Sequence, residues 1–226
     1  MKKIIIPFFS AVLFTTSVNA NVHTTTVEIS AVKSQLTSQQ IIDKYLDALG
    51  GKAKLESVKS IISEDLISTQ GIDITSVTKK MGNKFKSVQM IVGREIVSIF
   101  DGEKGYSNQT GPRVDFTPDR ISELKKAKTI DALGLDASKF TAAVETLDGK
   151  TCNVLVSENV KMYFDSSTGL LYKTGNALSG AVIKSYITVD GIKFPEVMEA
   201  EGGGQKLVIK TTKVTINSGI TDADFK

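Results

Sequence analysis

The sequence predicts an α+β protein in which a long antiparallel sheet curves around a small number of helices. Three observations support this prediction. Short turn signals recur between β-branched and apolar runs, a capped amphipathic helix precedes them, and many runs alternate apolar with polar residues. A sheet with one apolar face must close, or wrap around its helices, to keep that face away from water.

Four segments with a turn-forming aspartate separate predicted strands. They are "IFDGEKGYSN" (99–108), "TLDGKTC" (146–152), "FDSSTGLLY" (164–172) and "VDGIKF" (189–194). Asp101, in the first segment, is either a carboxylate presented for chemistry or part of a tight turn. Asp-Gly between apolar runs is a strong hairpin signal, because both residues tolerate positive φ. Since the same pattern recurs four times, we interpret all four aspartates as turn residues.

The N-terminal twenty residues, "MKKIIIPFFSAVLFTTSVNA", have the pattern of a secretory signal peptide: two lysines, an apolar stretch and a small-residue cleavage site. We predict cleavage after Ala20, a loose leader or first edge strand over 21–36, and a single domain over 37–226. No later stretch is long enough for a transmembrane segment. Because no lipidated cysteine follows the signal, we expect a soluble protein of the bacterial periplasm.

Charge and residue counts exclude several classes of function. The chain has 28 basic and 25 acidic residues, and its net charge of +3 falls to +1 when Lys2 and Lys3 leave with the signal. That balance offers no electrostatic footprint for nucleic acid. The only histidine, His23, excludes histidine-based triads and multi-histidine metal sites. Cys152 is the only cysteine, so no internal disulfide forms, and its apolar surroundings indicate an inert core thiol.

Three helices are predicted. The first covers 38–49, because Thr37 and Gln40 form a capping box and two glycines follow its last turn. A second, short helix is expected at 52–60. The third begins after Thr117 with a proline at its first position. Its C-terminal end is expected to carry Lys125, Lys126 and Lys128. One face of the first helix is apolar and consists of Ile41, Ile42, Tyr45, Leu46 and Leu49.

The remainder of the chain from residue 60 has the texture of β-structure. Eleven or twelve strands in sequential hairpins are predicted, and a change of parity near Thr211-Thr212 indicates a bulge. The predicted strands are 60–69, 72–81, 84–92, 94–100, 104–108, 141–147, 150–157, 160–165, 170–175, 181–189, 192–201 and 205–217.

Alternation in the second half of the chain identifies the residues that we expect to face an apolar interior. In strand 150–157 these begin with Cys152, and in strand 160–165 they begin with Val160. In strand 181–189, Ile183, Ile187 and Val189 fall on one face. In strand 192–201, Met198 falls on the face opposite to Glu199 and Glu201. The residues that we expect to line an apolar ligand cavity are Val154, Val156, Met162, Phe164, Ile183, Ile187 and Met198.

One set of motifs points to catalysis but is best explained by chance. Ser122–Lys125, Ser157–Asn159 and Lys173–Gly175 reproduce in order the three motifs of serine penicillin-recognising enzymes. The gaps between them are too short for the helical subdomain that such a site needs. Ser122 also falls in a polar, lysine-rich helix, where a solvated face is the simpler interpretation. We therefore predict no catalytic residue, no metal site and no cofactor.

Several segments, taken together and in order, resemble a known family. They are "IIDKYLDALGGKAKLESVKSI" (41–61), "FDGEKGY" (100–106), "YFDSSTGLLYKT" (163–174), "VDGIKFP" (189–195) and "VTINSGITDADF" (214–225). The chain resembles the outer-membrane lipoprotein-sorting-like proteins of Bacteroidetes, within the LolA/LolB lipoprotein-carrier superfamily. This resemblance implies a strongly curved antiparallel sheet of about eleven strands, an unclosed β-barrel with helices plugging its mouth. It also implies an apolar cavity for lipid or lipoprotein acyl chains.

Three classes of function follow from these observations. The first is a periplasmic carrier or binding protein for lipids or lipoprotein acyl chains. The second is an envelope interaction protein with a filled core and no ligand, which would bind a partner protein through exposed sheet edges. The third is an enzyme on the same scaffold, because one fold can host unrelated functions. The scarcity of catalytic motifs favours the first.

The signal peptide gives a direct test of export. We expect N-terminal sequencing of the protein isolated from bacterial cells to begin at Asn21, and fractionation to place it in the periplasm. Recovery of the chain from the membrane with Met1 retained would contradict the prediction.

Overall fold

The computed structural model describes residues 32–33, 35–109, 111–176, 179–202 and 204–226. The predicted signal peptide, most of the predicted leader and His23 lie outside the described residues. The described helices are α1 Ser38–Leu49, α2 Lys52–Ser57, α3 Pro118–Leu124 and three short 3-10 helices, η1 Asp131–Gly134, η2 Ala137–Lys139 and η3 Asp222–Phe225. The described strands are β1 Val32–Lys33, β2 Ser60–Thr69, β3 Ile72–Met81, β4 Lys84–Ile91, β5 Arg94–Phe100, β6 Gly105–Ser107, β7 Val114–Asp115, β8 Thr141–Leu147, β9 Lys150–Val156, β10 Lys161–Asp165, β11 Leu171–Gly175, β12 Ser179–Val189, β13 Ile192–Gly202 and β14 Gln205–Ile216.

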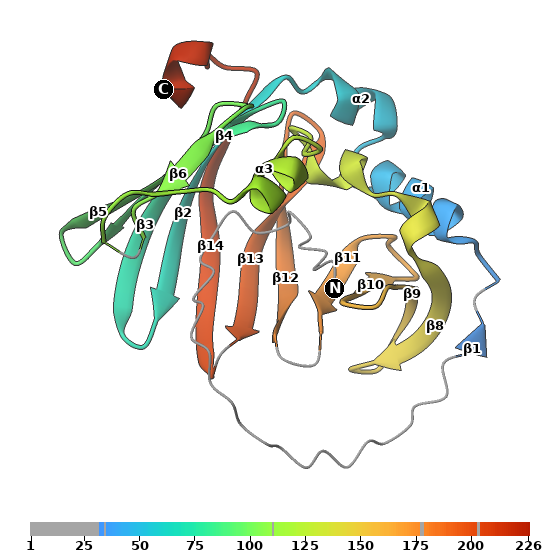
Figure 1. Cartoon of the computed structure of the whole chain (residues 1–226). Helices are drawn as coiled ribbons and strands as arrows, with labels where there is room; N and C mark the ends of the chain where they lie inside the picture. Colours follow the sequence, from blue (N-terminus) through green and yellow to red (C-terminus); the bar gives the residue numbers. More distant parts are fainter. Residues whose placement is uncertain (1–31, 34, 110, 177–178, 203) are drawn as a thin grey trace.

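The described strands form one antiparallel sheet that is strongly curved (Figure 1). Its order is β1-β8-β9-β10-β11-β12-β13-β14-β2-β3-β4-β5-β6-β7, so each half of the chain forms a meander and the pairing of β14 with β2 joins the two. Among the described strands, β1 and β7 are outermost and do not pair with each other, so the barrel is not closed. The predicted α+β class and unclosed sheet are confirmed. The described strands number fourteen rather than about eleven, since β1 and β7 have two residues each and give no periodic signal.

The first helix forms as its sequence predicts. The Thr37 side chain accepts a hydrogen bond from the Gln40 backbone, and the Gln40 side chain accepts one from the Thr37 backbone. Gly50 follows with φ of 135°, and a Cβ there would lie 2.5 Å from the Gly191 carbonyl oxygen. The glycine therefore lets the end of α1 touch the turn between β12 and β13.

Two helix predictions need correction. The second helix ends at Ser57 rather than at 60, because Ser60 already pairs with Met81 in the sheet. The third helix ends at Leu124, so the lysines that follow lie at or beyond its cap and not in its last turn. Leu124 is buried against Phe85 and Phe100, which fixes the end of α3 to the sheet.

The turn interpretation of the aspartates holds at the residue level. Asp148 and Asp190 have φ of 51° and 49°, and the glycine after each also has positive φ, as a two-residue hairpin turn requires. Asp101 accepts hydrogen bonds from the backbone N–H groups of Glu103 and Lys104, each at 2.8 Å. Asp165 accepts one from Ser167 N–H at 2.9 Å. These carboxylates hold turns together.

The largest apolar cluster lies between α1 and the concave face of the second meander, the strands β8 to β14. Tyr45 packs against Phe164 with ring centroids 5.0 Å apart, and both side chains are fully buried. Met162 pairs with Leu155, so these two side chains share a face and lie in this cluster. The predicted inner face of β9 was therefore the wrong one: Leu155 faces the main core, one position away from Val154.

Val154 is nevertheless buried, because the opposite face of β9 is covered too. It forms a separate cluster with Cys152 and Ala143, against which Val156, Tyr163 and Tyr172 pack. Cys152 is free and fully buried, and burial raises the pKa of its thiol. The prediction of an inert core thiol is confirmed in its placement, but the thiol lies outside the main core.

Irregular pairing bends two of the long strands. The register of β14 against β2 shifts between Thr211 and Lys213, which confirms the predicted bulge. The register of β12 against β13 shifts between Ile183 and Tyr186, which the alternation pattern did not reveal. After this second shift, Tyr186 packs against the main core.

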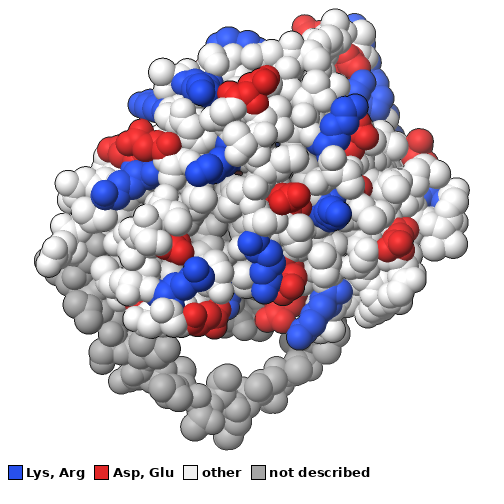
Figure 2. All heavy atoms as spheres, turned by 180° about the vertical axis from the view of Figure 1, so that it is seen from behind, with Lys and Arg blue, Asp and Glu red and all other residues white. Residues whose placement is uncertain are grey.

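The described part of the chain carries basic and acidic side chains on its surface (Figure 2). None of the described helices has the length and apolar character to span a bilayer. Figure 2 shows basic and acidic side chains interspersed over one face of the molecule, so that face presents no field of a single sign.

The packing of Phe164 gives a test of this core. We expect Phe164→Ala to lower the free energy of unfolding by about 3–5 kcal/mol, because it removes a large side chain from beneath α1. The matched control is Val114→Ala, at an edge residue that is 55% exposed, where we expect a change within about 0.5 kcal/mol. Denaturant unfolding measures both. Equal small losses for the two variants would contradict this account of the core.

Candidate ligand cavity

A partly open cavity of about 210 Å³ lies between the helices and the concave face of the sheet. Residues from α1, α2, η1, the loop before η1 and six strands line it. They are Tyr45, Leu49, Leu55, Ile61, Ser63, Asp65, Ser76, Thr78, Lys80, Thr129, Ile130, Asp131, Ala132, Leu171, Thr174, Ile183, Ile192, Lys193, Phe194, Pro195, Met198, Ile209, Thr211 and Val214.

The wall formed by the helices and the second meander is mainly apolar. Leu49 and Leu55 project from α1 and α2, and Ile183 and Ile192 face them from the paired strands β12 and β13. Met198 completes this wall beside Ile209, its cross-strand partner on β14. Such a surface gains free energy by excluding water when an apolar group enters.

The opposite wall, on β14, β2 and β3, combines a run of polar side chains with the apolar residues Ile61, Ile209 and Val214. Thr211 lies opposite Asp65 in the sheet, and Asp65 lies opposite Ser76 on the next strand. Ser63 and Thr78 form the neighbouring pair on the same face. Thr78 donates a hydrogen bond of 3.2 Å to Ser87 on β4, so part of this polar surface satisfies itself. We call Ser63, Asp65, Ser76, Thr78 and Thr211 the polar strip.

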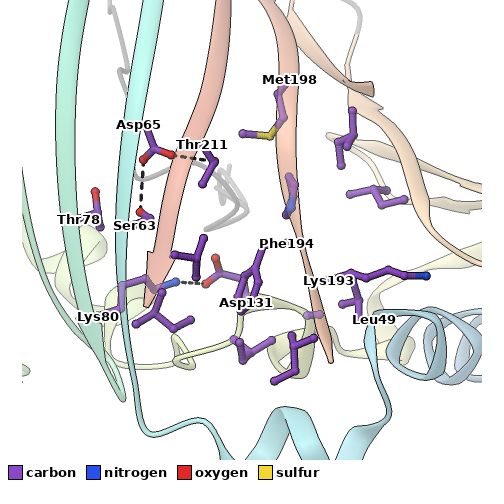
Figure 3. A pocket seen from close by; sticks show the side chains of 18 of the residues that line it. Leu49, Ser63, Asp65, Thr78, Lys80, Asp131, Lys193, Phe194, Met198 and Thr211 are labelled. Carbon is purple, nitrogen blue, oxygen red and sulfur yellow. Dashed lines mark hydrogen bonds and ion pairs between the residues drawn. The ribbon is translucent and has the colours of Figure 1, made fainter. Parts of the chain in front are cut away.

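Asp65 is the charged member of the polar strip. Its carboxylate accepts hydrogen bonds from Thr211 Oγ1 at 2.8 Å and from Ser63 Oγ at 3.3 Å, as Figure 3 shows. Burial raises the pKa of Asp65, and these two hydrogen bonds oppose the rise. Asp65 takes part in none of the ion pairs formed within the part of the chain that the structure describes.

An ion pair closes another part of the cavity. Lys80 Nζ on β3 lies 2.6 Å from Asp131 Oδ1 on η1, and the two side chains are 16% and 24% exposed. Burial raises the pKa of Asp131, and the neighbouring ammonium of Lys80 opposes that rise. The pair therefore ties η1, which contributes Asp131 and Ala132 to the cavity, to the sheet. Ile130, the residue before η1, also lines the cavity.

Two phenols at the base of α1 remain neutral. Burial raises the pKa of Tyr45 and of Tyr186, so neither ionises near neutral pH. The Tyr186 hydroxyl donates a hydrogen bond of 2.7 Å to the Leu171 carbonyl oxygen, next to the cavity. These groups orient side chains and supply no acid or base to the site.

The structure brings only some of the predicted cavity residues together. Ile183 and Met198 line the cavity. Met162 and Phe164 belong to the same core cluster as Ile183, but they pack beneath α1 and do not line the cavity. Val154 and Val156 lie in the separate cluster on the other face of β9. Ile187 is half-buried opposite Phe194 and is not among the lining residues.

The sequence analysis did not identify the polar strip or the ion pair, although β2 contained a signal for the polar strip. Its inward residues are Ile61, Ser63, Asp65 and Ile67, so two polar residues interrupt an apolar parity. Such an interruption marks a polar site on a buried face. The contribution of Asp131 could not be predicted, because it comes from a 3-10 helix far along the chain.

The serine and lysine motifs do not form a catalytic site. Ser157 and Lys173 line a second, partly open hollow, whereas Ser122 is not among its residues and lies exposed on α3. The Ser157 hydroxyl donates to the Val160 carbonyl oxygen, a local turn contact. Across the described residues, no three His, Cys, Asp or Glu side chains are grouped to hold a metal ion.

The fold and the cavity define a class of protein: a cupped single-sheet module with a small amphipathic pocket under its helices. Three solved structures share this fold. A DUF1329 family protein from Desulfovibrio piger has a TM-score of 0.54 at 12% identity, with 84% of this chain and 97% of that chain covered. A LolA superfamily protein from Nitrosomonas europaea has a TM-score of 0.53 at 13% identity, covering 84% and 98%. An outer membrane lipoprotein-sorting protein domain from Vibrio parahaemolyticus has a TM-score of 0.54 at 10% identity, covering 84% and 97%.

The chain therefore has the fold found in LolA superfamily and lipoprotein-sorting structures. At these identities the similarity establishes the fold alone. The resemblance found in the sequence motifs is confirmed at this level, and the narrower likeness to the Bacteroidetes members stays a prediction. No family model matches the sequence, and no curated protein matches it either.

The raised pKa of Asp65 makes a prediction about stability and pH. An acid whose pKa is higher in the folded than in the unfolded state destabilises the fold once pH exceeds the folded value. Stability lost in this way returns as pH falls through the raised pKa towards the ordinary value of 3.8. We therefore expect Asp65→Asn to increase the free energy of unfolding at pH 7, with the gain shrinking at pH 4.

The control for this prediction is Glu64→Gln, on the same strand. Glu64 pairs with Lys213 at 3.1 Å, and both side chains are largely exposed, so we expect a change within about 0.5 kcal/mol at both pH values. Denaturant unfolding of the two variants and the wild type decides the matter. A less stable Asp65→Asn protein at pH 7 would contradict the assignment.

Proposed function

We propose that this chain is a periplasmic binding or carrier protein that holds an acyl chain of a lipid or lipoprotein in the cavity. The observation that carries the proposal is the pairing of an apolar wall with a polar strip inside one partly open pocket. Ligand pockets are commonly apolar with a few placed polar groups, and they occur in the mouths of β-barrels. An amphiphile matches both walls at once.

The volume of the cavity supports a single chain as occupant. At about 30 Å³ per water-sized group, 210 Å³ holds about seven such groups, comparable to seven methylenes. Burying that many contributes about 5–6 kcal/mol at about 0.8 kcal/mol per methylene. Before the cost of ordering the chain, this corresponds to a dissociation constant of about 40–200 µM for a chain whose remainder extends through the open side.

The segment 130–132 covers part of the cavity, so a ligand that enters or leaves on this side must pass it. Ile130 and Ala132 cover part of the cavity, and the ion pair between Lys80 and Asp131 holds this cover to β3. Release requires that pair to separate or the chain to slide out past it. A carrier needs such a reversible cover, because a fully enclosed ligand would not transfer.

The comparisons and the N-terminal sequence support the setting of this function. One structural neighbour is described as a lipoprotein-sorting protein domain, and the signal pattern of residues 1–20 directs export. In this proposal the mature protein moves or stores acylated molecules between the membranes. The separation of Ser122 from Ser157 and Lys173 supports a role without catalysis.

Binding of a fluorescent fatty-acid analogue tests the proposal. After removal of any bound lipid, we expect the folded wild-type protein to bind the analogue saturably, with a dissociation constant of about 40–200 µM. Met198→Trp places a larger ring at the cavity wall and should weaken binding about tenfold or more.

The matched control is Val208→Trp. Val208 lies on β14 opposite Glu199, on the outer face of the sheet, and is 41% exposed. We expect this variant to bind like the wild type. Absence of saturable binding by folded, lipid-free wild-type protein would refute the proposal and favour an interaction protein with a filled core.

A further inference from the structure

Polar groups in the cavity are not equivalent, and the difference bears on which amphiphiles fit. Four lining residues carry formal charge: Asp65, Lys80, Asp131 and Lys193. Lys80 and Asp131 neutralise each other at 2.6 Å. Figure 3 shows the Lys193 side chain directed away from Asp65, on the side of the cavity where Leu49 lies. Asp65 is thus the charge left for a ligand within the polar strip.

The contacts of Asp65 leave it with acceptor capacity. A carboxylate has about four lone-pair sites, and the hydroxyls of Thr211 and Ser63 occupy two. Both contacts come from the strand neighbours of Asp65, so they orient its carboxylate without neutralising its charge. A group that enters the cavity meets a fixed, half-buried acceptor.

Apolar residues lie directly beside this acceptor on the same face. Ile67 follows two positions along β2, and its cross-strand neighbours are Ile74 and Ile209. Met198 packs against this group from β13. A ligand can therefore place a polar end at Asp65 while its chain continues along Met198 and Ile183 towards the helices.

We propose that the cavity selects amphiphiles whose polar end is a cationic amine, which donates hydrogen bonds to Asp65. This inference rests on the proposed acyl-chain function and specifies its ligand class. An ammonium supplies the donors and the opposite charge that the carboxylate lacks. A carboxylate or phosphate in the same place would face the charge of Asp65 in a partly desolvated site, unless it broke the pair of Lys80 with Asp131.

Burial supports the same conclusion. It raises the pKa of Asp65, which means that the free site disfavours the lone negative charge. A bound cation relieves that penalty, so binding and ionisation of Asp65 reinforce each other. Lys80, Asp131 and Lys193 are the other charged groups that line the cavity.

Three probes of equal chain length test the inference: decylamine, decanol and decanoate, each measured at pH 7.5 by displacement of the fluorescent fatty-acid analogue. We expect decylamine to bind about tenfold or more tightly than decanoate, as a charge-assisted hydrogen bond implies. In Asp65→Asn that preference should vanish through loss of decylamine affinity, with no loss for decanoate. The two hydroxyls donate to different oxygens of Asp65, so the isosteric asparagine keeps an acceptor for one of them and its amide N–H can donate to the other.

Glu64→Gln is the matched control, because it removes one carboxylate from the same strand on the outer face. It should retain the full preference for decylamine. Equal binding of decylamine and decanoate, or an unchanged preference in Asp65→Asn, overturns the inference and leaves the acyl-chain function standing. If none of the three probes displaces the analogue and the analogue itself does not bind, the proposed function fails and the inference fails with it.

Discussion

Everything in this structure depends on hiding the concave face of a sheet that does not close. Within the described residues, the outermost strands β1 and β7 do not pair with each other, so curvature alone cannot seal the interior of the sheet. The first helix supplies an apolar face that packs on the second meander, with Tyr45 against Phe164. Gly50 makes this possible, because only a residue without a side chain allows the helix end to meet the Gly191 carbonyl.

One short helix pair does not cover the whole concave face, and the residues beyond it explain what remains. Where β14, β2 and β3 pass under η1, small hydroxyl side chains and Asp65 replace the bulky apolar residues found elsewhere. Small polar residues fill less space and hold water or a ligand group better than a packed core does. The cavity is thus a consequence of residue choice along three strands, and its amphipathic character follows from the same choice.

Most of the fold could be predicted from the sequence, because its local signals agree with one another. The capping box at Thr37, the Asp-Gly turns and the alternation of long strands such as 72–81 all gave correct elements. Local sequence signals could not predict the two-residue strands or the pairing of β14 with β2, because these depend on contacts between distant parts of the chain.

The site was less predictable, and the reasons are physical. Both faces of β9 are buried, so alternation could not tell which of Val154 and Leu155 faces the main core. The register shift near Ser185 changed the parity of β12 after Ile183. Asp65 was visible in the sequence as one of two polar residues that interrupt the apolar parity of β2, but its importance depends on Thr211 and Met198, which are far away in the chain.

We propose that the space between the helices and the polar strip holds one amphiphile. Native mass spectrometry of the mature protein, purified from the periplasm without detergent, tests it most directly. We expect a fraction of the wild-type protein to carry one additional molecule with the mass of a lipid. The Val208→Trp variant should show the same bound fraction, and the Met198→Trp variant should not. Detection of the unliganded mass alone, with the same result after incubation with amphiphiles, would contradict it.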